Sequence, residues 1–125
     1  MPKIILLAEP EQAVRESICT LLGDEGYKCV CASDGENAIA ALNVFRFDLV
    51  ITEVQLPCLP GITIVEKAVY APSHPPVVLI TTYPNIDTAY EAMKLGASSF
   101  HLKPLDFSSF VRSINTLLTR QRVSA

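Results

Sequence analysis

Five short apolar runs, each followed by a segment of helical periodicity, constrain the fold of this chain more than any other feature. Each run is too short to be a helix by itself, and each reads as a strand. Continuous apolar strands are typical of a parallel sheet that is buried on both faces. The alternation therefore predicts a single-domain, three-layer, doubly wound α/β fold. The expected strands are residues 4–7, 27–31, 49–52, 77–81 and 100–102.

The segments between these runs predict five helices. The first follows Pro10, and the second opens with the capping-box pattern of Ser33 to Glu36. The third is expected over residues 62–70, and the fourth over residues 86–95, with Asn85 as its cap and Gly96 as its stop. The fifth starts after Asp106. The expected core-facing positions are Val14, Ile18, Leu21, Leu22, Ala38, Ala41, Leu42, Phe45, Phe107, Phe110, Val111, Ile114, Leu117 and Leu118.

Length and composition predict one folded unit. The 125 residues are half hydrophobic, so one sizeable core is expected, spanning 1–125 with a core of about 3–119 and a frayed tail over 120–125. A net charge of −3 with scattered basic residues argues against direct nucleic-acid contact. No apolar run reaches the roughly 20 residues of a membrane helix, and the start does not match a signal peptide. We expect a cytoplasmic protein without membrane contact.

Four cysteines occur without a C-x-x-C pair: Cys19, Cys29, Cys31 and Cys58. Cys29 and Cys31 lie two apart in an expected strand, and therefore on one face. Free, mostly buried thiols are favoured over a metal site or a disulfide. Cys58 falls in a loop without a neighbouring histidine to activate it, so we expect it to be inert.

The strand ends place chemically distinct side chains together. In open parallel sheets, ligands bind outside the carboxyl ends of the strands. Those ends carry Ala8 and Glu9, then Glu53, then Thr81, and finally Lys103. A strand-end acid alone is usually only solvated, and a lysine at a turn is usually a surface residue. Their convergence at one edge of the sheet favours a site.

Several motifs in order resemble the receiver domain of two-component response regulators. They are Gly26-Tyr27, Ser33-Asp34-Gly35-Glu36, Asp48-Leu49-Val50, Leu56-Pro57 with Gly61, the segment 92–97, and Lys103-Pro104-Leu105-Asp106. The resemblance covers nearly the whole chain. It implies a flavodoxin-like (βα)5 fold, with a parallel five-stranded sheet of order 2-1-3-4-5. It also implies magnesium held by acids after the first strand, and phosphotransfer from a histidine kinase to an aspartate at the position of Glu53.

The implied metal site departs from the family pattern. Of the two family acids after the first strand, the first position is Ala8 and the second is Glu9. Magnesium needs near-ideal octahedral geometry, which usually includes one or two carboxylates, so the loss of an acid weakens binding. We expect no cofactor and at most weak magnesium binding, for which Glu9, Glu53 and the backbone of Gln55 are the candidates.

The implied phosphoacceptor is changed as well. The extra methylene of Glu53 moves its carboxylate outward by roughly 1.5 Å. A displacement of about 1 Å can cost a reacting group on the order of a hundredfold in rate. Glu9, Glu53 and Lys103 sum to a charge of about −1 with ordinary ionisation. We expect an ion pair between Lys103 and Glu53 to close the pocket without a cation.

The resemblance also implies switch and partner residues. Thr81 and Phe100 match the hydroxyl and aromatic residues that move together in the family, and Pro104 follows the pocket lysine. A partner face is expected on the fourth helix, the fifth strand and the fifth helix, with candidates Ile86, Tyr90, Lys94 and Arg112. More often, such helix residues belong simply to the rim and core. His74 and His101 are expected to be structural.

Three functions are compatible with these residues. The leading hypothesis is a phosphorylation-independent, non-enzymatic interaction module that binds a protein partner, such as a histidine kinase, or a second copy of itself. The alternative is a slow but genuine phosphoacceptor that uses Glu53. A flavodoxin-like cofactor-binding protein is disfavoured, because the loop after the first strand is acidic and lacks the glycines that hold phosphate.

Overall fold

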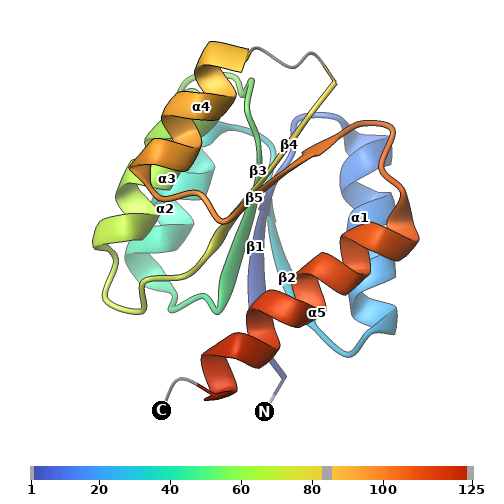
Figure 1. Ribbon diagram of the computed structural model, residues 1–125. Helices are drawn as coiled ribbons and strands as arrows, with labels where there is room; N and C mark the ends of the chain where they lie inside the picture. The colour runs from blue at the N-terminus through green and yellow to red at the C-terminus, as the bar shows by residue number, and fades with distance from the viewer. Residues whose placement is uncertain (1, 83–85, 124–125) are drawn as a thin grey trace.

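The computed structural model describes residues 2–82 and 86–123, with the side chains of residues 86 and 120–123 outside the description. Strands and helices alternate along the whole chain (Figure 1). The strands are β1 (Ile4–Ala8), β2 (Lys28–Ala32), β3 (Leu49–Glu53), β4 (Val77–Thr81) and β5 (Ser99–Leu102). The helices are α1 (Gln12–Asp24), α2 (Gly35–Val44), α3 (Gly61–Tyr70), α4 (Ile86–Leu95) and α5 (Phe107–Val123).

The five strands form one parallel sheet of order β2-β1-β3-β4-β5. Helices α1 and α5 cover one face of the sheet, and α2, α3 and α4 cover the other (Figure 1). The predicted doubly wound, flavodoxin-like architecture is therefore confirmed. None of the described helices is both long enough and apolar enough to pass through a bilayer.

Alternate strand residues build two separate cores. Leu6, Val50 and Leu79 are fully or almost fully buried beneath α2, α3 and α4. Ile5 and Ile51 point to the opposite face, where they pack with residues of α1 and α5. Each such aliphatic side chain contributes about 1.5–3 kcal/mol when it is fully buried. These two buried apolar layers therefore hold the strands in place, and the polar residues lie at the carboxyl ends of these strands.

The start of α2 and the end of α4 follow the usual capping preferences of helices. The Asp34 carboxylate caps α2 by accepting a hydrogen bond from the backbone N–H of Asn37 at 2.8 Å, so the cap is this aspartate rather than a Ser33–Glu36 box. Gly96 ends α4 with a φ of +121°, a conformation that favours glycine. The predicted cap Asn85 lies outside the described residues.

Two expected core residues, Phe45 and Phe107, are wrong. Phe107 is 45% exposed because it is the first residue of α5, and the buried positions of that helix begin at Phe110. Phe45 lies beyond the end of α2 and is half exposed, whereas Phe47 is buried with 2% exposure. The two rings meet edge to face, with their centroids 6.0 Å apart. The helix ends at Val44, so the helical spacing that predicted a buried Phe45 does not extend to that residue. The chain is extended from Phe45 onward, and Phe47 enters the core instead.

The strands at the site extend further than the sequence predicted. Ala8 and Glu53 are the last residues of β1 and β3, paired with Thr52 and Ile80 of the neighbouring strands. Their positions are therefore set by ladder hydrogen bonds rather than by a loop. The predicted range of β2 began one residue early, since Tyr27 precedes the strand.

Candidate functional site

Two carboxylates and one ammonium group are buried together at the carboxyl ends of the strands. Glu9 follows β1 and is fully buried, and Glu53 ends β3 with 5% exposure. Lys103 follows β5, and its side chain is 9% exposed. Because all five strands are parallel, these three ends meet at one edge of the sheet. Buried charges are stable only when they are paired, so their contacts determine the properties of the site.

The Lys103 ammonium lies between the two acids. Its Nζ donates to Glu9 Oε1 at 2.5 Å and to Glu53 Oε1 at 2.7 Å. The other oxygen of each acid accepts a backbone N–H, from Glu11 at 2.9 Å and from Gln55 at 3.2 Å. All four carboxylate oxygens are therefore engaged inside the protein. We refer to Glu9, Glu53 and Lys103 as the acid–lysine cluster.

The backbone of Glu9 is held from two sides. Its N–H donates to the carbonyl of Ala32 on β2 at 3.0 Å. Its carbonyl accepts a hydrogen bond from Arg15 Nη1 of α1 at 2.8 Å, and the same nitrogen lies 3.4 Å from the carbonyl oxygen of Pro10. Sequence reasoning missed Arg15. The available signal was a cation in the first turns of the helix that follows an acidic loop.

Two glycines allow close packing of the loop after Glu53. A Cβ atom at Gly61 would lie 2.3 Å from the Glu53 carbonyl oxygen, and one at Gly35 would lie 2.4 Å from the Leu59 carbonyl oxygen. The Gly61 N–H donates a hydrogen bond to the Val54 carbonyl oxygen at 2.9 Å. Only glycine permits this approach, which holds the backbone around Glu53 against the starts of α2 and α3.

Opposing effects determine the pKa of Lys103. Burial by itself lowers the pKa of this ammonium, but the hydrogen bonds and charges of Glu53 and Glu9 outweigh the burial and raise it above its ordinary value. Lys103 is therefore a firmly charged cation at neutral pH. It neutralises one of the two carboxylates and leaves the cluster with a formal charge of −1.

The residues of this site do not fit a magnesium ion. Ala8 offers no donor, and the ammonium of Lys103 stands where it engages both carboxylates at once. Within residues 2–82 and 86–123, no group of three or more His, Cys, Asp or Glu side chains is arranged to hold a metal ion. An octahedral ion bound by Glu9 and Glu53 would require both acids to release Lys103.

Comparison with known proteins identifies the family. The model of the response regulator receiver domain matches residues 5–115, which is most of the chain. The chain belongs to the response regulator receiver family. It is thus a receiver domain of two-component signalling, a class of module that binds Mg²⁺ at its phosphorylation site and interacts with histidine kinases and other proteins.

The curated relatives are longer proteins. The transcriptional regulatory protein PcoR of Escherichia coli is 31% identical over 121 residues, which cover 97% of this chain and 54% of that protein. The transcriptional regulatory protein PdtaR of Mycobacterium tuberculosis is 29% identical over 123 residues, covering 98% of this chain and 60% of that protein. The chain thus spans little more than half the length of these two relatives.

Solved structures share the fold. A CheY-like receiver domain from Methanospirillum hungatei superposes with a TM-score of 0.95 at 22% identity, and each chain is covered completely. The receiver domain of the sensor histidine kinase PA1611 from Pseudomonas aeruginosa, solved with a magnesium ion in its active-site cleft, gives a TM-score of 0.85 at 19% identity, covering 95% of this chain and 99% of that chain.

Thr81, Pro104 and Gln55 adjoin the acid–lysine cluster, whereas the expected switch residue Phe100 contacts the core. Thr81 ends β4 with 2% exposure, and its carbonyl accepts the backbone N–H of Lys103 at 2.8 Å. Pro104 follows on the surface through a cis peptide bond. Phe100 is half buried and packs against the core beneath α2, α3 and α4. Gln55 has an exposed side chain and contacts Glu53 through its backbone N–H.

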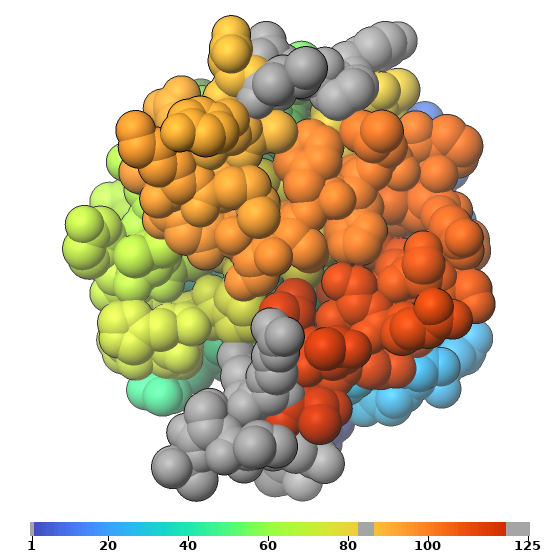
Figure 2. Space-filling model, viewed as in Figure 1, coloured from blue at the N-terminus to red at the C-terminus, as the bar shows by residue number. Residues whose placement is uncertain are grey.

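Three of the expected partner residues, Tyr90, Lys94 and Arg112, lie on α4 and α5. Tyr90 is 69% exposed, with the Lys94 ammonium 5.9 Å from its ring centroid, and Arg112 is exposed on α5. The side chain of Ile86 lies outside the described residues. Figure 2 shows α4, β5 and α5 side by side on one face of the molecule. We refer to this surface as the α4–β5–α5 face.

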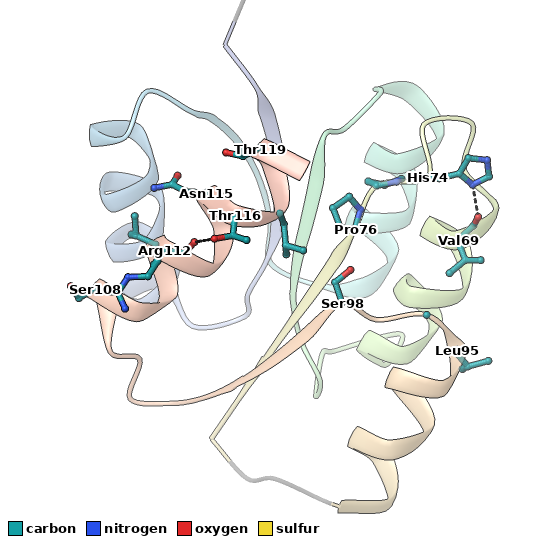
Figure 3. A pocket seen from close by; sticks show the side chains of 14 residues that line it. Val69, His74, Pro76, Leu95, Ser98, Ser108, Arg112, Asn115, Thr116 and Thr119 are labelled. Atoms are coloured by element: carbon teal, nitrogen blue, oxygen red, sulfur yellow. Dashed lines mark hydrogen bonds between the residues drawn. The ribbon is translucent and has the colours of Figure 1, made fainter. Parts of the chain in front are cut away.

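A groove of about 1320 Å³ lies at the border of this face of the receiver domain, between α5 and the C-terminal ends of α3 and α4. Arg112, Asn115 and Thr116 line it from α5, and His74 and Leu95 line it from the opposite wall (Figure 3). The residues that line the groove do not include Glu9, Glu53 or Lys103. The hollow on this surface and the buried charges are therefore in different places.

Proposed function

We propose that this receiver domain is a phosphorylation-independent, non-enzymatic interaction module of two-component signalling in the cytoplasm. The single observation that supports this proposal is the double contact of the Lys103 ammonium with Glu9 and Glu53. This contact supplies from within the protein the positive charge that a metal ion supplies to a receiver domain. The site has a stable charge state with no ion and no phosphoryl group.

The engagement of Glu53 opposes phosphotransfer. A nucleophilic carboxylate needs a free oxygen in line with the phosphorus atom, whereas Oε1 of Glu53 binds Lys103 and Oε2 binds the Gln55 amide. Freeing one oxygen would break a charged hydrogen bond in a site with 5% exposure. Without a well-held magnesium ion, the charge on the transferred group is not offset either. Glu53 therefore acts as a structural anion.

Thr81 and Phe100 then transmit no phosphorylation signal. Thr81 is held at the end of β4 by the backbone contact with Lys103, so its position is coupled to the acid–lysine cluster. Phe100 lies half buried on the α4 side of the sheet. In this account the surface of the domain has one resting arrangement, and a partner recognises that arrangement.

The partner binds the α4–β5–α5 face. Tyr90 and Arg112 are types of residue that contribute strongly to protein interfaces, and both are exposed here. The groove beside Arg112 gives this surface the concavity that a partner segment can fill. The partner is a protein, either a histidine kinase or a second copy of the chain. Residues 1–125 act as one domain with a core of about 3–119.

Restoring the family acids tests the proposal. The variant Ala8→Asp with Glu53→Asp, treated with acetyl phosphate and magnesium, is expected to gain the mass of one phosphoryl group, because it regains an acid and a shorter nucleophile. The original chain is expected to remain unlabelled. Ala8→Asp with Glu53→Gln is the matched control, since it restores the acid without a nucleophile. Stoichiometric labelling of the original chain that disappears in Glu53→Gln would establish the slow phosphoacceptor instead.

A further inference from the structure

Three of the four cysteines gather where α1 packs against β2. Cys19 lies on α1, and Cys29 and Cys31 lie two residues apart on β2, so they share the face that α1 covers. Cys19 and Cys29 both pack against the core between the sheet and α5. Strand β2 is at the edge of the sheet, paired only with β1 among the described strands.

The thiols are more accessible than the sequence predicted. Cys31 is exposed, and Cys19 and Cys29 are only half buried, so the expectation of mostly buried thiols is wrong. The reason is the edge position of β2, whose outer side has no neighbouring strand. The Cys19 thiol interacts with both Cys29 and Cys31. Cys58 is also exposed, but it lies in the loop after β3.

The two contacts of Cys19 act on it in opposite directions. Burial raises the pKa of Cys19, contact with Cys31 lowers it, and contact with Cys29 raises it. Burial raises the pKa of Cys29 to about 11 and that of Cys31 to about 12. Within the pair Cys19 and Cys31, the same contact lowers one pKa and raises the other, so Cys19 ionises first. Arg15 further lowers the pKa of both thiols of this pair.

We propose that Cys19 and Cys31 are a redox pair that a peroxide converts to a disulfide linking α1 to β2. The Cys19 thiolate attacks one oxygen of hydrogen peroxide, the O–O bond breaks, and hydroxide leaves, which oxidises this sulfur to a sulfenic acid. The Cys31 sulfur then attacks the Cys19 sulfur. The S–O bond breaks, and the oxygen leaves as water with the thiol proton. A thiol reductant reverses the step.

Cys31 rather than Cys29 is the partner of Cys19 for two reasons. Cys31 is exposed, so a thiol reductant reaches its sulfur in the disulfide, whereas Cys29 is half buried. Contact with Cys31 also stabilises the thiolate of Cys19, and contact with Cys29 opposes it. A link between Cys29 and Cys31 themselves is disfavoured, because side chains two apart on a strand run parallel rather than toward each other.

The disulfide would act on the acid–lysine cluster. Ala32, next to Cys31, accepts the backbone N–H of Glu9, and Arg15, one helical turn before Cys19, donates to the Glu9 carbonyl. The pair therefore joins the two segments that hold the backbone of Glu9. Oxidation would restrict the separation of α1 from β2 and keep Glu9 in place.

Peptide mapping without reductant after hydrogen peroxide treatment tests the pair. We expect a monomer that loses two hydrogens and yields one Cys19–Cys31 linked peptide, at a rate that rises with pH because the thiolate fraction rises. The disulfide would close the loop from Cys19 to Cys31, which should raise Tm by on the order of 10 °C. Cys58→Ser is the matched control and should still form the link. Cys19→Ser and Cys31→Ser should each abolish it.

Hydrogen exchange provides a second readout that does not depend on folding of the variants. In the oxidised original chain, exchange of the Glu9 amide should slow relative to the reduced chain, while that of Ala97, at the far side of the sheet, should not change. Links that join Cys19 to Cys29, links between chains through Cys31 or Cys58, or unchanged exchange at Glu9 would each overturn the proposal.

Discussion

The carboxyl ends of the strands and the α4–β5–α5 face use charged residues in opposite ways. At the strand ends, Glu9, Glu53 and Lys103 are almost fully buried, and they satisfy one another. On the α4–β5–α5 face, Lys94 and Arg112 are exposed, and Arg112 lines an open groove. The charges at the strand ends stabilise the fold, whereas those on the face are accessible to a second molecule.

The energetics of the two regions should therefore differ. Removing one member of a buried ion pair leaves an unpaired charge at low dielectric and is strongly destabilising. Removing an exposed side chain leaves no buried charge or polar group unpaired, so the free energy of unfolding changes little. Substitutions in the first region should change folding, and substitutions in the second should change binding.

The largest effect is expected for Lys103→Met. The substitution keeps the apolar stem but leaves the Glu9 and Glu53 carboxylates buried beside each other, at a cost of about 3–5 kcal/mol in the free energy of unfolding. Urea denaturation followed by circular dichroism measures this loss. Lys94→Met, at an exposed position on α4, is the control and should change stability by less than about 0.5 kcal/mol. Equal effects of the two variants would remove the distinction between the regions.

A smaller loss is expected for Gly61→Ala. The new Cβ would meet the Glu53 carbonyl oxygen at 2.3 Å, so the backbone at the cluster must shift, at a cost of about 1–3 kcal/mol. Gly23→Ala is the matched control, because its Cβ meets nothing within 4 Å on α1. That variant should gain about 0.5–1 kcal/mol from helix propensity. A neutral Gly61→Ala would show that the loop around Glu53 is loosely packed.

The loss of stability at acidic pH should depend in part on His101, which lies on β5. Burial lowers the pKa of His101, whose ring contacts Phe110 edge to face with centroids 5.2 Å apart. The unfolded chain therefore takes up this proton first as the pH falls, so the His101 contribution is present above about pH 6.5 and is lost as the pH falls through the lower folded pKa. Urea midpoints measured from pH 7.5 to 5 should fall less steeply in His101→Gln. An identical slope in both proteins would exclude this residue as the cause.

The smallest effects on stability are expected on the α4–β5–α5 face. Tyr90→Ala and Arg112→Ala should each change the free energy of unfolding by less than about 0.5 kcal/mol, because both side chains are exposed. Self-association, followed by analytical ultracentrifugation, or binding to a histidine kinase should weaken in these variants. A large loss of stability with unchanged association would place their role in the fold instead.

The sequence predicted the architecture because the periodicities of strands and helices dominate in a chain buried on both faces of its sheet. All five strands and all five helices occur near their expected positions. Phe45 was misplaced because the end of α2 depends on where the chain leaves the helix, which a local pattern does not determine. The accessibility of Cys31 depends on β2 being an edge strand, which is a property of the whole sheet.

The site was less predictable than the fold. The strand ends indicated Glu9, Glu53 and Lys103, and these side chains are in contact. The simultaneous contact of Lys103 with both acids is a result of side-chain rotamers, which the sequence does not specify. The hydrogen bond from Arg15 to Glu9 likewise depends on how α1 packs on the sheet. Contacts between distant elements follow from packing rather than from spacing along the chain.

Magnesium titration monitored by backbone NMR tests the acid–lysine cluster most directly. The amides of Glu9, Glu53 and Gln55 report on the oxygens that an ion would have to take from Lys103. We predict no saturable shift of these amides through millimolar magnesium, while the variant Ala8→Asp with Glu53→Asp shows one. Saturable shifts at all three amides of the original chain would contradict a cluster whose two carboxylates are held by Lys103 without a metal ion.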